Sequence, residues 1–276
     1  MNMTRRQFLF TAAAVASATV LRGQVPAATG PATAPSYGGL TLGIQSYSLR
    51  DRSFARMLDA LRDPLGLAAV EIFPGHILGQ NPRDIAELLT ARGIKAMSYG
   101  VVNFGRDEAK NRREFELARV LGLSNLSADP DPDPACFASL EKLTEEYGVT
   151  IAIHPHGPGH RWGRRDQLDV AFKGRSNRIG LCGDTGHLIR AGEDPLSTLR
   201  AYADRLHAIH LKDFKKLPGD NKWQDVPAGD ATLDVEGIIH FLMERRFPGG
   251  VFIEYEGGNP IEAIQASLAR VAKAAG

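Results

Sequence analysis

The stretch Ile179–His187, with the sequence IGLCGDTGH, contains the two features that decide the fold. A short apolar run is followed directly by Asp184 and, three residues later, by His187. Uniformly apolar runs of this length are typical of parallel strands that are buried on both faces. The polar residues after the run predict a functional site at the C-terminal end of such a strand.

Eight apolar runs recur along the chain, at 42–47, 68–73, 94–99, 123–127, 149–153, 179–182, 206–211 and 251–254. Helical patterns follow them, at 54–61, 82–89, 114–121, 135–147, 166–173, 195–203, 235–244 and 261–273. Eight strands alternating with eight helices predict an α/β protein with a single (β/α)8 TIM barrel. A doubly wound sheet also alternates, but it usually has fewer strands and a glycine-rich first turn, and no G-x-G-x-x-G motif follows the first run.

The composition is that of an ordinary globular protein. Of the 276 residues, 43% are apolar and 24% charged, which excludes disordered and collagen-like chains. The formal net charge of +1 gives no basic excess, which argues against nucleic acid as a partner. The two cysteines, Cys136 and Cys182, are too few for a disulfide scaffold. No linker interrupts residues 40–276, so we expect one barrel domain there.

Residues 1–35 have a different character from the rest. Arg5 and Arg6 precede an uncharged run, 8–21, which is rich in alanine and too short to span a bilayer comfortably. This is the pattern of a signal peptide, and the paired arginines resemble a twin-arginine export signal. The alternative, an ordinary amphipathic helix, lacks the polar face that such a helix needs. We therefore expect an exported, periplasmic or extracytoplasmic protein without stable membrane insertion after signal removal.

An export signal and linker over 1–35 would change the charge of the remaining chain. Its removal takes away three arginines and no acid, so the formal net charge falls from +1 to −2. A slightly acidic barrel strengthens the argument against a nucleic-acid partner.

Residues of the metal-ligand type stand at the ends of four consecutive predicted strands. They are His154, Asp184, His210 and Glu254. Such side chains are costly inside a barrel unless they are paired or coordinated, and one divalent cation would satisfy all four. Imidazole and carboxylate ligands suit manganese, zinc, cobalt or iron. A lone histidine is more often a hydrogen-bonded core residue, and His207 and Glu256 compete with His210 and Glu254 for the inward positions.

At these strand ends the chain resembles the sugar phosphate isomerase/epimerase-like family, the xylose-isomerase-like barrels. The resemblance covers roughly residues 40–275. Its specific parts are Asp184-Thr185-Gly186-His187, His210-Leu211-Lys212-Asp213, Ile253-Glu254-Tyr255-Glu256 and Val70-Glu71-Ile72.

The resemblance implies that Asp184, His210 and Glu254 bind metal and that His187 contacts the substrate or supports a ligand. It also marks Glu71 as the family's strand-two glutamate. Many members have a glutamate at the end of strand five, where this chain has His154 in a His-Pro-His sequence. This departure puts in doubt the two-carboxylate scheme of the ketose epimerases.

The expected chemistry is proton abstraction next to a sugar carbonyl, through an enediolate. The predicted catalytic residues are Glu254, His187, Lys212 and Glu71. The predicted substrate-binding residues are His156, His160, Arg161, Trp162 and Glu256. Two of these roles have plainer alternatives, since Trp162 could anchor its loop and Lys212 could be an ordinary lysine paired with Asp213.

The sequence therefore predicts a metal-dependent isomerase or epimerase acting on a small, unphosphorylated sugar. A lyase acting on keto-sugars or keto-glycosides would use the same enolisation. A non-catalytic sugar-binding barrel is a third hypothesis. An endonuclease-IV-like enzyme is disfavoured, because it needs more metal ligands and a basic face.

Overall fold

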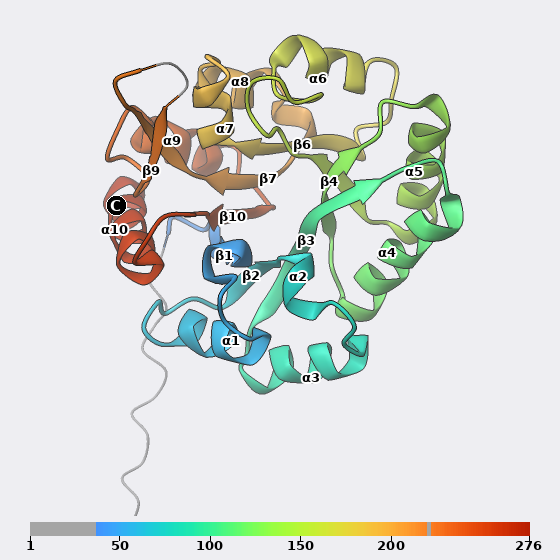
Figure 1. The fold of residues 1–276 in the computed structure, drawn as a ribbon, viewed down its shortest axis with the longest axis horizontal. Helices are drawn as coiled ribbons and strands as arrows, with labels where there is room; N and C mark the ends of the chain where they lie inside the picture. The colour runs from blue at the N-terminus through green and yellow to red at the C-terminus, as the bar shows by residue number, and fades with distance from the viewer. Residues whose placement is uncertain (1–36, 220–221) are drawn as a thin grey trace, which may run out of the picture. The chain divides into compact units, whose positions relative to one another are not determined.

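The computed structural model describes residues 37–219 and 222–276. Eight parallel strands close into a barrel, in the spatial order β1-β10-β7-β6-β5-β4-β3-β2 (Figure 1). The barrel strands are β1 (Thr41–Gln45), β2 (Ala69–Ile72), β3 (Lys95–Phe104), β4 (Asn125–Pro130), β5 (Thr150–Ile153), β6 (Ile179–Asp184), β7 (Leu206–Leu211) and β10 (Gly250–Ile253). The prediction of a TIM barrel is confirmed.

Helices connect successive strands and surround the barrel (Figure 1). The longer ones are α1 (Phe54–Arg62), α3 (Pro82–Ala91), α4 (Glu108–Leu121), α5 (Pro134–Tyr147), α6 (Arg165–Phe172), α8 (Pro195–Ala201), α9 (Val235–Glu244) and α10 (Pro260–Ala275). Short helices α2 (Pro74–Ile77) and α7 (Thr185–Arg190) and 3-10 turns η1 (Ser46–Leu49) and η2 (Ala203–Arg205) were not predicted.

Local chemistry explains where two of the helices begin. The Asp133 carboxylate accepts a hydrogen bond from the Ala135 amide, and Pro134 occupies the first turn of α5, as expected for an N-terminal cap. Helix α4 begins at Glu108, earlier than the predicted start at residue 114. The Asp107 carboxylate accepts from the amides of Ala109 and Lys110, which stabilises this additional N-terminal segment.

A small antiparallel hairpin of β8 (Asp213–Lys216) and β9 (Trp223–Val226) follows strand β7. The sequence analysis did not predict it. Its strands are four residues long and rich in charged and polar side chains, so they lack the apolar run by which the barrel strands were found.

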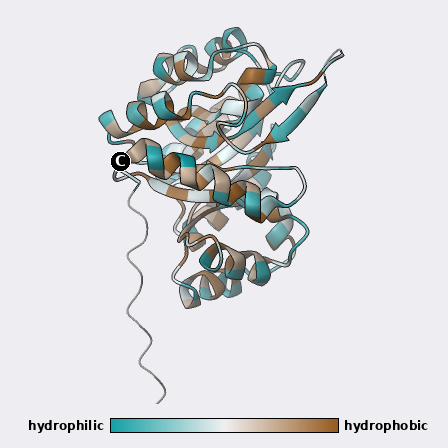
Figure 2. Cartoon of the chain, turned by 90° about the vertical axis from the view of Figure 1, so that its left-hand side faces the viewer, coloured by the Kyte–Doolittle hydropathy of each residue, from teal (hydrophilic) through white to brown (hydrophobic). Residues whose placement is uncertain are grey.

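The apolar core has two parts. A large cluster joins the strands to the surrounding helices, and hydrophobic residues are interspersed with hydrophilic ones along those helices (Figure 2). A second, smaller cluster contains one residue from each of six barrel strands, which places it inside the closed barrel. Its members are Ala69, Met97, Ala152, Cys182, Ala208 and Phe252.

The signal and linker predicted for 1–35 lie outside the described residues. All described residues fall within one compact unit, Thr33–Gly276. Across 37–219 and 222–276, no helix combines the length and apolar character needed to cross a membrane.

Candidate metal centre and active site

Side chains alternate between the two faces of each barrel strand, and this alternation determines which polar residues point into the barrel. Positions two apart on a strand share a face, so a residue two positions after a member of the small interior cluster also points into the barrel. Five strands place a polar residue at that position, in the next layer toward their C-terminal ends. The pairs are Ala69 and Glu71, Ala152 and His154, Cys182 and Asp184, Ala208 and His210, and Phe252 and Glu254.

This layering distinguishes the two histidines of strand β7. His210 shares the inward face with Ala208 and is fully buried. His207 lies on the opposite face, where its Nε2 is 2.8 Å from the carbonyl oxygen of Asn177. The structure therefore places His210, and not His207, among the possible ligands.

The four predicted ligands come together at one point. His154, Asp184, His210 and Glu254 each offer one ligand atom, and these atoms all lie within 4.8 Å of one another. Oδ2 of Asp184 is 3.2 Å from Nε2 of His154 and 3.7 Å from Nδ1 of His210. All four side chains are buried. Two imidazole nitrogens and two carboxylate oxygens form a donor set for a first-row divalent metal.

The contacts of His210 show which of its two ring nitrogens can bind a cation. Its Nε2 lies 2.9 Å from Oε1 of Glu71, and because an ionised carboxylate only accepts, Nε2 must carry a proton. In a neutral ring, Nδ1 then presents a lone pair. That atom lies 3.1 Å from Oε2 of Glu254, and neither atom has a hydrogen-bond partner. Two buried acceptors facing each other fit a cation placed between them.

The charge balance of the described residues leads to the same result. Glu71, Asp184 and Glu254 are three buried carboxylates, and Lys212 is the buried ammonium beside them. Burial alone lowers the pKa of His210, but the surrounding anions, Glu71 and Asp184 among them, raise this pKa well above its usual value. The pocket thus draws a proton when no other cation compensates it. A divalent ion would compensate the negative charge that Lys212 leaves on these carboxylates.

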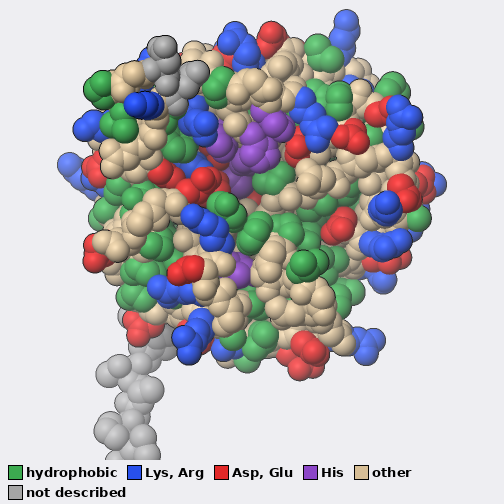
Figure 3. All heavy atoms as spheres, in the orientation of Figure 1, with side chains coloured by type: hydrophobic (Ala, Val, Ile, Leu, Met, Phe, Trp, Pro, Cys, Tyr) green, Lys and Arg blue, Asp and Glu red, His purple; other side chains and the backbone are tan. Residues whose placement is uncertain are grey.

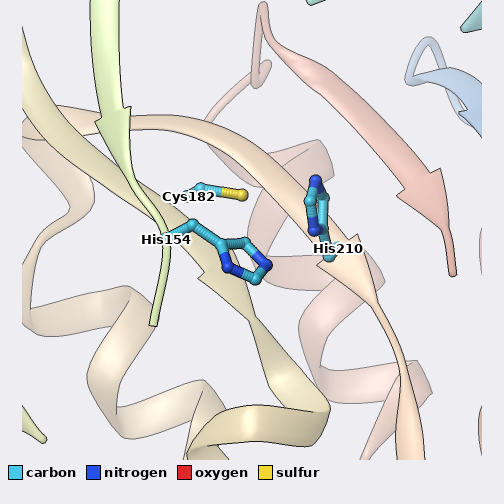
Figure 4. A group of neighbouring side chains, drawn as sticks. All are labelled: His154, Cys182 and His210. Carbon is cyan, nitrogen blue, oxygen red and sulfur yellow. The ribbon is translucent and has the colours of Figure 1, made fainter. Parts of the chain in front are cut away.

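A second possible set consists of His154, Cys182 and His210, which come from the three adjacent strands β5, β6 and β7 (Figure 4). This set offers three donor atoms and no carboxylate, whereas the other set offers four, two of them carboxylate oxygens. Cys182 belongs instead to the small interior cluster that supports the polar layer. The carboxylate-containing set is therefore the better candidate for a metal centre.

Glu71 contacts this group of residues through His210. It is fully buried, and its carboxylate accepts hydrogen bonds from Gln45 and Ser127, each at 2.7 Å, besides the contact with His210. It is absent from the residues that line the cavity. The structure thus gives Glu71 a positioning role, whereas the sequence analysis predicted a catalytic one. Gln45 and Ser127 were missed, although both are polar residues within predicted apolar runs and Ser127 ends its run.

A cavity of about 310 Å³ opens above the metal ligands. Polar side chains from strand ends form one part of its lining, and the aromatic rings of Tyr47 and Phe73 form another. The lining residues are Gln45, Tyr47, Phe73, Gly100, Val101, His154, His156, His187, Glu254 and Glu256. Histidine side chains gather in a hollow of this face, beside acidic groups (Figure 3).

Two of the predicted residues, His156 and His187, stand in the cavity as neutral bases. Burial lowers the pKa of His156 to about 3, and neighbouring histidines lower it further. Burial also lowers the pKa of His187, to about 4. Their ring centroids are 5.6 Å apart. By contrast, Lys212 and His210 outweigh the effect of burial and hold the pKa of Glu254 at about 2, which favours a ligand over a base.

Lys212 lies behind the cavity and is fully buried. Its Nζ is 3.7 Å from Oε1 of Glu254 and forms a close ion pair with Glu256. The alternative pairing with Asp213 is not seen, because Oδ2 of Asp213 accepts from the backbone amides of Gly229 and Ala231. Lys212 therefore holds two carboxylates of the site in place and moderates their negative charge.

Asp225 on the β8–β9 hairpin is a further acidic group that the sequence analysis missed. Its Oδ2 accepts the Glu256 amide at 2.7 Å, and its Oδ1 is buried without a hydrogen-bond partner. Burial raises its pKa to about 7. No sequence signal marked this residue, because the hairpin itself was not predicted.

The loop after strand β5 holds the remaining predicted residues. Arg161 pairs with Asp129 and Asp131, with its Nε 2.7 Å from Oδ1 of Asp129. The Trp162 indole N–H donates to the carbonyl oxygen of Pro130, and only 4% of this residue is exposed. Neither residue lines the cavity. Their placement favours anchoring of the loop over contact with a substrate.

Comparison with known proteins agrees with this geometry. The family model described as "Xylose isomerase-like TIM barrel" matches residues 58–274. An inosose dehydratase of Clostridium beijerinckii is 30% identical over 142 residues, which cover 45% of this chain and 47% of that enzyme. The chain thus matches about half the length of this curated relative.

Two solved structures illustrate the shared fold. The IolI protein, whose crystal structure contains a zinc atom, is 19% identical with a TM-score of 0.64, over 86% of this chain and 98% of IolI. The 3-keto-D-glucoside 4-epimerase YcjR of E. coli is 14% identical with a TM-score of 0.63, over 85% and 99% of the two chains. The barrel, the metal-ligand group at its mouth and the family match together identify the chain as a member of the xylose isomerase-like TIM barrel family.

Proposed function

We propose that this protein is a divalent-metal-dependent enzyme that enolises a polyhydroxylated ketone. The observation that carries the proposal is the juxtaposition of four buried metal ligands with two neutral histidines in one cavity. Bound at His154, Asp184, His210 and Glu254, the metal would polarise a substrate carbonyl and make the neighbouring C–H group more acidic.

His187 is the candidate base for that proton. It lines the cavity, and its lowered pKa of about 4 keeps the imidazole unprotonated at neutral pH. His156 is a second neutral imidazole in the cavity, with its ring centroid 5.6 Å from that of His187. Lys212 contacts both Glu254 and Glu256 and lowers the pKa of Glu254, which keeps that carboxylate ionised.

The fate of the enolised sugar distinguishes two activities. If the carbon next to the enol carries a hydroxyl group, protonation of that group by one histidine and its departure as water completes a dehydration. The partial match to an inosose dehydratase favours this outcome. Return of the proton to the other face of the same carbon gives an epimer instead. Its return to the neighbouring carbon gives an isomer, and the sequence predicts one of these two activities.

The cavity favours an unphosphorylated substrate. None of its ten lining residues is lysine or arginine, and Lys212 behind it is already engaged by two carboxylates. The lining therefore offers a phosphate group no lysine or arginine side chain, and it places the carboxylates of Glu254 and Glu256 in the same cavity. Tyr47 and Phe73 instead offer apolar surface to the C–H face of a sugar ring.

The test uses the full chain, loaded with manganese or zinc and incubated in heavy water with an inosose, a 3-keto-D-glucoside or D-tagatose. Solvent deuterium in recovered sugar indicates enolisation, and loss of water identifies a dehydratase. A His187→Gln variant should lose exchange, whereas Glu262→Gln on the outer helix α10 should retain it. Absence of exchange and of product across the three probes, in protein that holds its metal, would contradict the proposal.

Export of the protein is a separate proposal, based on residues 1–35. A reporter fused to these residues should reach the periplasm of a host with a twin-arginine system. Replacement of Arg5 and Arg6 by lysine should retain it in the cytoplasm. Export of the doubly substituted fusion at the original rate would refute a twin-arginine route.

A further inference from the structure

A second group of metal-ligand side chains lies beside the first. Asp129 is the next-to-last residue of strand β4, and His156 and His160 belong to the loop after β5. Each offers one ligand atom, and the three atoms lie within 4.8 Å of one another. Nε2 of His160 is 3.2 Å from Oδ2 of Asp129, and the rings of His156 and His160 are 4.7 Å apart. Two imidazoles and one carboxylate form a common ligand set for zinc, iron and manganese.

The loop is built to hold His160 at this position. The His160 amide donates to the carbonyl oxygen of Gly157, and the Gly163 amide donates to that of His160. Gly157 has a φ of 88°, a left-handed conformation that favours glycine. The hydrogen bond from Trp162 to Pro130 then ties the loop to the end of β4.

Arg161 orients the carboxylate of this group. Its Nε lies 2.7 Å from Oδ1 of Asp129 and its Nη2 lies 2.8 Å from Oδ2. Its Nη1 pairs with the more exposed Asp131, so two carboxylates share one guanidinium. The pairing also holds Asp129 in one orientation, which reduces the entropy lost when a cation binds.

His156 provides an independent sign of a ligand. Its Nδ1 is buried and has no hydrogen-bond partner. The nearest rings around it are other imidazoles, with centroids at 4.5 Å for His154, 4.7 Å for His160 and 5.6 Å for His187. A buried nitrogen surrounded by other potential metal ligands is satisfied when a cation binds among them.

We propose that Asp129, His156 and His160 bind a second divalent cation, of the class that takes mixed nitrogen and oxygen ligands. His156 lines the same cavity as the first centre, and its ring contacts that of His154. The second site therefore adjoins the cavity of the first through His156.

The test is the number of metal ions bound. Full-length protein is stripped with a chelator, reloaded with zinc, freed of loosely bound metal and analysed by mass spectrometry of the element. The wild type should bind two equivalents and His160→Ala one. Asp184→Asn, which damages the first centre, should retain the equivalent at the second.

A matched control is His240→Ala, because the His240 imidazole bonds to the Ala274 carbonyl oxygen away from the cavity and should not affect the count. Cobalt substitution gives a second readout, since His160→Ala should remove one component of the visible spectrum while circular dichroism remains unchanged. One equivalent in the wild type, or two in a folded His160→Ala variant, would overturn the proposal. It stands or falls separately from the enolisation activity, which this experiment does not measure.

Discussion

Nε2 of His210 lies 2.9 Å from Oε1 of Glu71, although 139 positions separate the two residues in the sequence. This contact leaves Nδ1 of His210 as the metal-facing atom. In Glu71→Gln the ring loses its anionic partner, and an amide N–H facing Nε2 would favour the wrong tautomer. We expect divalent-metal affinity to fall by about 10–100-fold, the usual effect of removing such a partner.

Competition with a chromophoric chelator measures this loss. Glu87→Gln is the control, because Glu87 is exposed on helix α3 and far from the interior layer. A Glu71→Gln variant that folds and binds metal as tightly as the wild type would show that His210 does not depend on Glu71.

Lys212→Met tests the charge balance of the site. The substitution removes the ammonium 3.7 Å from Glu254 and leaves the carboxylates less compensated. Because a nearby cation opposes a second one, we expect the variant to bind a divalent metal more tightly, on the order of tenfold. Its metal-free form should unfold at a lower temperature, and added metal should raise that temperature more than in the wild type. Lys216→Met, on the exposed part of the hairpin, is the control; weaker metal binding by Lys212→Met would refute the argument.

Trp162 offers a test of anchoring against substrate stacking. Trp162→Ala should reduce the free energy of unfolding by about 3–5 kcal/mol, because it removes a buried ring. Trp162→Phe keeps a ring against Phe137 and loses the hydrogen bond to Pro130, so it should cost only about 1 kcal/mol. Urea unfolding measures both values. If Trp162→Phe left stability unchanged but abolished sugar binding, stacking on the substrate would be the better explanation.

Much of the fold could be predicted because each barrel strand is a short apolar run with a polar residue near its end. Periodicity alone could not predict which residues of each run point into the barrel. His207 and His210 both lie in one such run, and the inward face is decided by Ala208 and the other small interior residues, which come from strands far apart in sequence. Only the closed barrel brings these residues into one layer.

The roles of individual residues were harder to predict than their presence. Glu71 was singled out, but its partner His210 is visible only in three dimensions, so a positioning residue was predicted as catalytic. Arg161 was predicted to bind substrate, and the sequence analysis did not connect it with Asp129 near the end of β4. The β8–β9 hairpin was missed because its stability depends on pairing and on contacts such as that of Asp225 with Glu256.

Asp225 predicts a specific pH dependence of stability. Burial raises its pKa from 3.8 to about 7, so the native protein holds this proton more tightly than the unfolded chain does. The resulting stabilisation is complete below the unfolded pKa and is lost as the pH rises through about 7. Asp225→Asn mimics the protonated carboxyl, so its thermal midpoint relative to wild type should increase between about pH 4 and 7 and level off above. Asp84→Asn, on the exposed start of α3, should show no such trend, and a flat difference for Asp225→Asn would mean that this carboxyl is already ionised in the native protein at low pH.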